Sequence, residues 1–308
     1  MASPEERFAA AGAHFPEPVQ ALLQQIPARQ GLLPGPMVEE IMGRMKCSDI
    51  DRLMIMLLPL AAAYARAPIS KFQVGAVAAG LLNESRAPGL YLGANVEFAR
   101  QALSFSVHAE QAATTNAWLH GERGLSRLAI SAAPCGYCRQ FLFEVVNGQA
   151  MQILVAVQGT APPPSNPLTY FLPDAFGPND LGVNGGLMQP QSNGVTLSNP
   201  DPLAQAAAAA ANASYAPYTQ NFSGVALQTA DGAIFAGRYA ENAAHNPSMS
   251  PLQSAITLMN MSGALSPAAA IVRAVLVEVP TLASQHDATV AVLSSLAPGV
   301  TLEYFPVS

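Results

Sequence analysis

Between residues 106 and 138 the sequence holds two short clusters of residue types that bind metal ions. His108 is followed two positions later by Glu110, and Cys135 and Cys138 lie in a Pro-Cys-Gly-Tyr-Cys run. Imidazole nitrogen and thiolate sulfur are ligands that Zn²⁺ favours, and a structural zinc site usually closes with four of them. Here three protein ligands leave a fourth position for water. The spacing therefore predicts a catalytic zinc site held by His108, Cys135 and Cys138.

The carboxylate beside the histidine has a separate role in this prediction. Zinc lowers the pKa of a bound water from ~16 toward ~7, so that hydroxide becomes available at neutral pH. Glu110, near the start of an expected helix, can reach this water and move its proton. The pattern H-x-E…P-C-x-x-C is a signature of zinc-dependent nucleobase deaminases. The alternative is a buried histidine near two cysteines that pack as small apolar residues, which explains neither Glu110 nor Pro134.

Composition limits the partners of the chain. The 308 residues suffice for about two domains. Half of the residues are hydrophobic and only 11% are charged, which indicates that some apolar surface is buried between subunits. The net charge is −6 and no run of Lys or Arg occurs, whereas nucleic-acid-binding proteins carry a basic patch or stripe. We therefore expect no nucleic-acid partner.

Cysteine usage and hydropathy favour a cytoplasmic protein without membrane association. Cys47 lies outside the two clusters and is expected to be a small buried residue; nothing suggests a disulfide framework, so a reducing compartment fits. Residues 1–11 include Glu5 and Glu6 and lack an apolar run, so they are no secretory signal. The most apolar run, 53–65, is too short to span a bilayer and contains Pro59.

Strands and helices alternate along residues 49–160, which predicts an α/β layered catalytic domain after a helical segment over 1–48. A helix through 53–60 follows Asp49, a candidate cap. The remaining expected elements are strands at 71–77, 90–94, 128–132 and 151–158, a turn-rich connection at 83–89, and helices at 106–119 and from Pro134 to about 146. Both metal-binding clusters then stand at helix starts, where the partial positive charge favours thiolates.

Residues 161–202 are rich in proline, glycine and asparagine, which predicts an extended linker rather than a helix. Within it, the run Leu-Pro-Asp-Ala-Phe-Gly-Pro at 172–178 is too apolar for a plain tether. It either packs against another surface or covers the local core.

The last section, 203–308, repeats the pattern of the catalytic domain. Residues 221–227 correspond to the strand at 71–77, and 236–242 correspond to 92–98. Ser250 stands opposite His108, Leu252 stands opposite Glu110, and no cysteine follows Cys138. This copy therefore cannot build the metal site and is expected to be a structural and dimer-forming partner. We expect one Zn²⁺ per chain.

With these motifs, the chain resembles the cytidine deaminases of the two-domain, homodimeric class, from about residue 22 to the end. The resemblance implies a three-layer α/β/α catalytic domain, a degenerate second copy of it and a short N-terminal helical segment. The motifs that carry the resemblance are Phe-x-Val-Gly-Ala at 72–76, Gly-Ala-Asn-x-Glu-Phe at 93–98, His-Ala-Glu-Gln at 108–111, Pro-Cys-Gly-x-Cys-Arg-Gln at 134–140 and the apolar run at 172–178.

The resemblance also implies roles for further residues. Asn95 and Glu97 would bind the ribose hydroxyls, and Phe72 would pack against the pyrimidine. Phe176 and the corner at 244–245 would close the site of the neighbouring subunit, although His245 departs from the aromatic residue usual there. Ala109 would be a further substrate contact.

The residues themselves support two of these roles. Asn95 and Glu97 are alternate residues at a predicted strand end, on one side of the strand, and an amide and a carboxylate can together pair a diol. The alternatives are polar turn residues for this pair and core packing for Phe72. A carboxylate near the sugar also disfavours a phosphorylated substrate by charge repulsion.

The function predicted is hydrolytic deamination of cytidine and 2′-deoxycytidine to uridine and 2′-deoxyuridine, a step of pyrimidine salvage. Hydroxide on zinc would attack C4, while Glu110 would carry protons to N3 and to the departing amine. One alternative is a dCMP-type nucleotide deaminase, which needs cationic groups for the phosphate. Others are a polynucleotide deaminase, opposed by the acidic charge, and a zinc-stabilised binding protein without catalysis.

Overall fold

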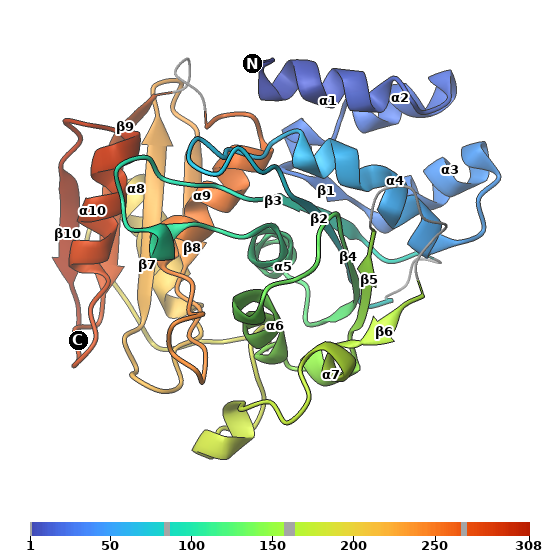
Figure 1. Cartoon of the computed structure of the whole chain (residues 1–308). Helices are drawn as coiled ribbons and strands as arrows, with labels where there is room; N and C mark the ends of the chain where they lie inside the picture. The colour runs from blue at the N-terminus through green and yellow to red at the C-terminus, as the bar shows by residue number, and fades with distance from the viewer. Residues whose placement is uncertain (1, 83–86, 157–163, 266–269) are drawn as a thin grey trace.

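The computed structural model describes residues 2–82, 87–156, 164–265 and 270–308. Two α/β units pack against each other, one drawn in blue and green and the other in yellow to red (Figure 1). The first unit holds a sheet with strand order β1-β3-β2-β4-β5-β6, and the second holds a sheet with order β10-β9-β7-β8. The predicted α/β class is confirmed, and each unit places helices on both faces of its sheet.

The first sheet is antiparallel except at one pair. β2 pairs with β3 and β4 in antiparallel fashion, while β4 and β5 run parallel. The strand predicted at 90–94 is confirmed. The strand predicted at 71–77 begins only at Gly75, because the side-chain amide of Asn95 binds the backbone of Phe72 and Val74, at 2.9 Å each, in place of a neighbouring strand. The strands are β1 (Leu32–Leu33), β2 (Gly75–Gly80), β3 (Leu90–Ala94), β4 (Leu125–Ile130), β5 (Gln152–Val155) and β6 (Asn166–Pro167).

Helices cover both faces of this sheet, so the predicted three layers are present. On the outer face lies α4 (Ile50–Ala62), which Asp49 caps by accepting a hydrogen bond from the backbone of Asp51, as predicted. Cys47 is half-buried and its thiol donates to the carbonyl of Asp49. The helices packed behind α4 are α1 (Pro4–Gly12), α2 (Glu17–Leu23) and α3 (Gly35–Met45). On the inner face lie α5 (Ala109–Leu119) and α6 (Gly136–Phe143).

The second unit repeats the first, which confirms the predicted degenerate copy. Its order β8-β7-β9-β10 reproduces β3-β2-β4-β5, and its β9–β10 pair is again the parallel one. Even the register shift of β2, between Ala79 and Gly80, recurs in β7 between Gln228 and Thr229. The elements are α8 (Pro202–Asn212), β7 (Ser223–Thr229), β8 (Ile234–Arg238), α9 (Pro251–Met261), β9 (Ile271–Glu278), α10 (His286–Leu296) and β10 (Leu302–Pro306).

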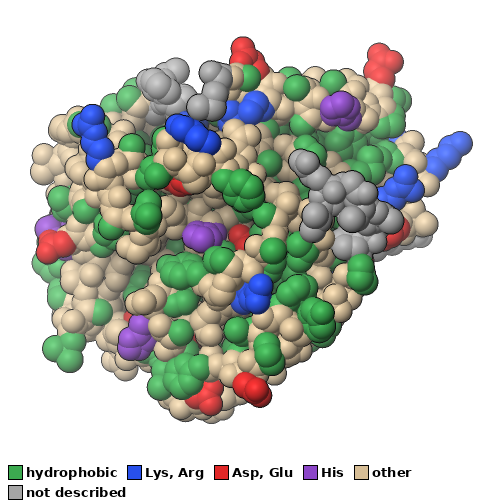
Figure 2. Space-filling model, in the orientation of Figure 1, with side chains coloured by type: hydrophobic (Ala, Val, Ile, Leu, Met, Phe, Trp, Pro, Cys, Tyr) green, Lys and Arg blue, Asp and Glu red, His purple; other side chains and the backbone are tan. Residues whose placement is uncertain are grey.

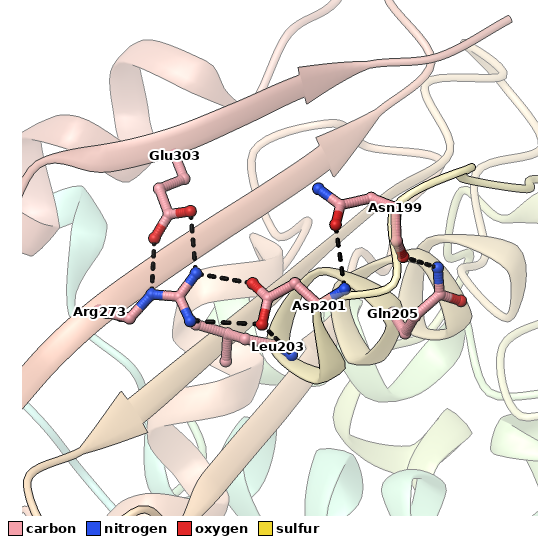
Figure 3. A network of polar contacts seen from close by, with 6 residues as sticks. All are labelled: Asn199, Asp201, Leu203, Gln205, Arg273 and Glu303. Carbon is pink, nitrogen blue, oxygen red and sulfur yellow. Dashed lines mark hydrogen bonds and ion pairs between the residues drawn. The ribbon is translucent and has the colours of Figure 1, made fainter.

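An ion-pair cluster joins three elements of this second copy (Figure 3). Arg273 of β9 donates to Glu303 of β10 and to Asp201, the N-cap of α8. The hydrogen bond from Arg273 lowers the pKa of Asp201. The cluster therefore fixes the start of α8 against the edge of the second sheet.

The two copies share one hydrophobic core. It includes Ala112 and Ala113 of α5 together with Leu252 and Ala255 of α9, and it continues into both sheets. Because α5 and α9 each lie on the inner face of their own sheet, the start of α5 is enclosed by both copies. The metal-binding motif therefore lies beside the second copy.

The segment 161–202 differs from its prediction. Residues 157–163 lie outside the described part, and so do residues 83–86 of the predicted turn. Beyond them the chain is not an extended linker throughout, because β6 adds to the sheet next to β5 and is followed by α7 (Leu168–Phe171) and by a short 3₁₀-helix at Pro178–Leu181. Leu168 is fully buried. The domain boundaries at 48, 160 and 202 stay predictions.

In the described part of the chain, every helix is too short or too polar to cross a bilayer.

Close contact between α5 and β3 depends on Gly93. A Cβ at this position would lie 2.1 Å from the backbone nitrogen of Ala113, and the equivalent Gly237 of the second copy has the same relation to Ala255. We predict that Gly93→Ala lowers the free energy of unfolding by about 1–3 kcal/mol, because backbone atoms cannot move aside. Denaturant unfolding measures the change.

The matched control is Gly43→Ala. Gly43 lies in α3, and, apart from its chain neighbours and the adjacent backbone of its own helix, no atom of the described residues comes within 4 Å of the place that an added methyl group would occupy. Alanine there should raise stability by about 0.5–1 kcal/mol through the lower entropy of the unfolded chain. Equal effects of the two substitutions would contradict the assigned role of Gly93.

Candidate metal centre and active site

Three ligand atoms converge at one point. The Nδ1 atom of His108 lies 3.5 Å from Sγ of Cys135 and 3.2 Å from Sγ of Cys138, and the two sulfurs are 3.5 Å apart. A tetrahedral zinc site with usual bond lengths separates its ligand atoms by about 3.5–3.8 Å. The three side chains therefore fit a zinc ion, with one coordination position free of protein ligands among the described residues.

The ends of two helices bring these ligands together. His108 is the N-cap of α5 and Cys135 is the N-cap of α6, while Cys138 lies in the first turn of α6. Both helix starts are therefore at the metal-binding point, as predicted. The predicted bounds need correction: α5 begins at Ala109 rather than at residue 106, and α6 ends at Phe143. Pro134 precedes the cap of α6 and does not occupy its first turn.

The thiols and the imidazole are electrostatically coupled. Hydrogen bonds from Cys138 and His108 lower the pKa of Cys135 to about 3. The hydrogen bond with Cys135 raises the pKa of His108. The hydrogen bond between Cys135 and Cys138, together with burial, raises the pKa of Cys138. A thiolate is thus already favoured at Cys135, and zinc binding must displace the proton of Cys138.

Glu110 lies beside this cluster in the first turn of α5 and is only 4% exposed. Burial raises the pKa of its carboxyl to about 7, against the lowering effect of hydrogen bonds that include one with Cys138. A buried carboxyl whose pKa is near neutrality can both accept and release a proton at physiological pH. The proton-carrier role that the sequence predicts for Glu110 stays a prediction.

A cavity of about 450 Å³ opens next to the cluster. Glu110 and Cys135 line it together with Asn95 and Glu97. A cavity of this volume suits a small organic ligand rather than a macromolecule. Of the residues predicted for substrate binding, the following line it: Phe72, Asn95, Glu97 and Ala109.

Glu97 is fixed by the turn that precedes β2. Its carboxylate accepts hydrogen bonds from the backbone of Ile69 at 2.8 Å, from the backbone of Ser70 at 3.0 Å and from the Ser70 hydroxyl. Burial acts to raise the pKa of Glu97, but these hydrogen bonds and nearby Lys71 lower it overall. The cavity therefore holds an ionised carboxylate with a defined orientation.

The structure does not bring Phe176 into the cavity of its own chain. Its side chain is 47% exposed, and its carbonyl accepts a hydrogen bond from Gln140 of α6 at 2.7 Å. His245 is also exposed and has a positive φ of 61°. The run 172–178 is therefore attached to the helix that carries Cys138, with Phe176 facing outward.

Several residues around the site were not predicted. Ser70 orients Glu97, Leu103 lines the mouth of the cavity, and the ring of Tyr137 stacks on His108 with centroids 5.5 Å apart. Tyr137 was recognisable in principle, because it lies between the two cysteines of the motif. Leu103 had no local signal, since its position depends on how the 98–107 loop crosses the cavity.

Comparisons with known proteins bear on the same residues. The family model described as "Cytidine and deoxycytidylate deaminase zinc-binding region" matches residues 48–153, and a second model with the same description matches 168–291. The cytidine deaminase of Yersinia pestis (strain Pestoides F) is 44% identical over 295 residues, which are 95% of this chain and 96% of the relative. The cytidine deaminase of Yersinia pseudotuberculosis serotype O:1b (strain IP 31758) gives the same values.

Among solved structures, cytidine deaminase from Burkholderia pseudomallei is 27% identical, with 41% of this chain and 98% of that chain covered and a TM-score of 0.36. Both halves of the present chain match a deaminase zinc-binding region, so by class the protein is a two-domain zinc-dependent deaminase. The 44% identity with the Yersinia cytidine deaminases extends over nearly the full length of both chains, which identifies one family within this class. The chain belongs to the cytidine deaminase family, and zinc is its cofactor.

We predict that Cys135→Ala reduces zinc from one ion per chain to less than about a tenth of that, because one of three protein ligands is lost. Metal analysis of the purified variant measures this. Cys47→Ala is the matched control, since Cys47 lies outside the cluster and should leave the zinc content unchanged. Full zinc occupancy in the Cys135 variant would show that the metal is bound elsewhere.

Proposed function

We propose that the protein hydrolyses cytidine and 2′-deoxycytidine to uridine and 2′-deoxyuridine with release of ammonia, in pyrimidine salvage. The observation that carries the proposal is the arrangement of one cavity. It is lined by two of the metal-binding residues and by the buried, protonatable carboxyl of Glu110, and also by the ionised carboxylate of Glu97 and the amide of Asn95. A nucleoside has groups that match both sets of residues, because its base would react beside Glu110 and its sugar hydroxyls would donate to Glu97.

In this proposal His108, Cys135 and Cys138 hold the zinc ion, which supplies Lewis-acid activation of a water molecule when bound. Glu110 accepts a proton from the attacking water and delivers it to N3 of the ring. It then takes the second proton from the oxygen now bonded to C4 and passes it to the amine, so that the C4–N bond breaks, ammonia leaves and C4 becomes a carbonyl. Its burial supports this double role, because the charged and neutral forms are close in free energy when the pKa is about 7.

The sugar is assigned to the side chains of Glu97 and Asn95, which line the cavity. Glu97 would accept hydrogen bonds from the ribose hydroxyls, since its ionised state favours donors as partners. Both ends of the Asn95 amide already bind the backbone of Phe72 and Val74, so Asn95 contributes through the remaining lone pair of its oxygen. Phe72 is 60% exposed and lines the cavity, which supports a contact with the pyrimidine rather than core packing.

A nucleoside fits the cavity better than a nucleotide. Among the described residues that line it, none is Lys or Arg, whereas a 5′-phosphate needs cationic or backbone donors. Nucleic acid is disfavoured for a related reason, because Lys and Arg side chains are scattered over the face shown in Figure 2. We therefore assign the free nucleoside as substrate.

We also assign a homodimer in the cytoplasm, in which each subunit closes the site of its neighbour. Ile69, Phe72 and Leu103 are exposed apolar side chains at the mouth of the cavity, and Phe176 is exposed on the same chain. Burying such side chains between two copies is favourable by about 25 cal/mol per Å². Thiolate zinc ligands are also protected from oxidation in a reducing compartment.

The direct test is Glu110→Gln. We expect zinc binding to remain at one ion per chain and the turnover of cytidine to fall by about a hundred- to ten-thousandfold, because the amide cannot carry the proton. Ultraviolet absorbance follows the conversion of cytidine, with a chelator-treated sample and with dCMP as comparisons. Normal turnover by the variant would refute the assigned role, and faster turnover of dCMP than of cytidine would refute the nucleoside assignment.

Sugar recognition has its own test, Glu97→Gln. We predict an increase in KM for cytidine of about tenfold or more, because a hydrogen bond to a charged acceptor contributes about 1.5–3 kcal/mol. The increase should shrink with a substrate analogue that lacks the 2′ and 3′ hydroxyls.

Glu241→Gln is the matched control for this substitution. Glu241 accepts the equivalent hydrogen bonds, from the backbone of Tyr218 and Thr219 and from the Thr219 hydroxyl, but it does not line the cavity. It should change stability without changing KM. The same rise in KM in both variants would mean that the effect comes from the turn and not from the sugar.

A further inference from the structure

The two copies exchange a pair of equivalent hydrogen bonds near the metal-binding point. Gln111, in the first turn of α5, donates from its side chain to the carbonyl of Pro247 in the second copy at 3.3 Å. Gln253, in the first turn of α9, donates in return to the carbonyl of Phe105 in the first copy at 2.6 Å. Both glutamines are buried. Each helix start is therefore attached to the loop that precedes the other.

The bond from Gln253 acts on the loop that leads to His108. Phe105 lies three residues before the metal ligand, in a short 3₁₀-helix at Leu103–Phe105. From there to α5, the first copy holds the backbone by the pair of bonds between Val96 and Val107, at 2.8 and 2.9 Å, and by the bond from the backbone of His108 to the Gln111 side chain at 3.2 Å. Gln253 provides a further fixed point at Phe105, and this one comes from the copy without metal ligands.

A second contact reaches the cysteine cluster. The hydroxyl of Tyr137 donates to the carbonyl of Asn246 in the second copy at 2.6 Å. The ring of the same residue stacks on the imidazole of His108, with an angle of 26° between the planes. Because Tyr137 lies between Cys135 and Cys138 in the sequence, its hydroxyl bond fixes the cysteine turn and its ring restricts the histidine.

From these contacts we infer that the metal-free copy positions the zinc ligands of the other copy within the same chain. Gln253 and Tyr137 are the positioning residues, acting through the Phe105 carbonyl and the His108 ring. The inference rests on the assignment of His108, Cys135 and Cys138 as zinc ligands made above. The second copy thereby has a function in metal binding although it has no metal ligand of its own.

The physical reason is the geometry that zinc requires. Residues that orient metal ligands from outside the coordination sphere affect metal affinity or activity by about 10–100-fold when they are removed. Here two of the orienting groups, the Gln253 amide and the Asn246 carbonyl, come from the second copy, so the relative placement of the two copies affects the ligand geometry. A loosened bond at Phe105 or Asn246 would widen the range of ligand positions and speed the loss of the ion.

The test uses two variants of the full-length zinc protein. Tyr137→Phe removes the hydroxyl and keeps the ring on His108. Gln253→Glu keeps the acceptor for the backbone of Ser250, which lies 2.8 Å away, and removes the donor to Phe105. We expect each variant to release zinc to a chromogenic chelator about three- to tenfold faster than the parent protein. The visible absorption bands of the cobalt(II)-substituted proteins should shift, and kcat for cytidine should fall more than KM rises.

The control loosens the interface between the copies at another place. Arg238 of the second copy donates to the carbonyl of Trp118 at 2.8 Å and lies over its indole ring. Trp118 is near the far end of α5, about 15 Å along the helix from His108. Arg238→Met should lower the melting temperature while leaving the rate of zinc release and the cobalt spectrum unchanged.

The outcomes separate the possible failures. Unchanged zinc release and cobalt spectra in both Tyr137→Phe and Gln253→Glu overturn the inference, and so does an equal change in the Arg238 control, which would show only general loosening. If one of the two variants does not fold, the other decides. A parent protein that binds zinc but does not deaminate cytidine would refute the proposed function alone, because zinc release and cobalt spectra are measured without turnover.

Discussion

The site depends on two helix N-termini that meet at one point. His108 and Cys135 are both N-cap residues, so their side chains extend from the positive ends of α5 and α6 toward each other. This field favours the thiolate form that zinc needs. The meeting requires α5 to lie almost in contact with β3, which Gly93 permits because it has no side chain. The spacing of the zinc ligands and the pKa of the cysteine thiols therefore both depend on the close packing of α5 on β3.

The second copy shows what remains when the metal is no longer required. Ser250 replaces the histidine and caps α9 with its own hydroxyl, which accepts from the backbone of Gln253. The close glycine contact and the register shift in the sheet both persist, so they belong to the fold rather than to the metal. At the helix start, Ser250 and Leu252 stand in place of His108 and Glu110, and no cysteine follows Cys138. Helices α5 and α9 pack against each other in one core although only α5 carries a metal ligand at its start.

The sequence predicted the site better than it predicted the connections around it. His108, Glu110, Cys135 and Cys138 were identifiable because zinc chemistry restricts both residue type and spacing, and the structure brings their side chains together. The residues at 166–171 were not identifiable, because the pairing of β6 with β5 and the burial of Leu168 depend on distant segments. The start of β2 was missed for the same reason, since a side chain distant in sequence takes the place of a strand. Sequence patterns do not predict a strand or its start where a contact with a distant segment supplies the hydrogen bonds of the backbone.

The comparison of Glu97 with Glu241 separates fold from function within one chain. Both carboxylates accept bonds from two successive backbone amides and a hydroxyl, so the turn before the central strand requires an acceptor in either copy. Glu241 is 2% exposed, whereas Glu97 is half-buried and faces the cavity. An acceptor that the fold already fixes in place can bind a sugar without further loss of side-chain entropy. The sugar contact proposed for Glu97 would therefore use a carboxylate that the turn already holds in place and that, unlike Glu241, lines the cavity.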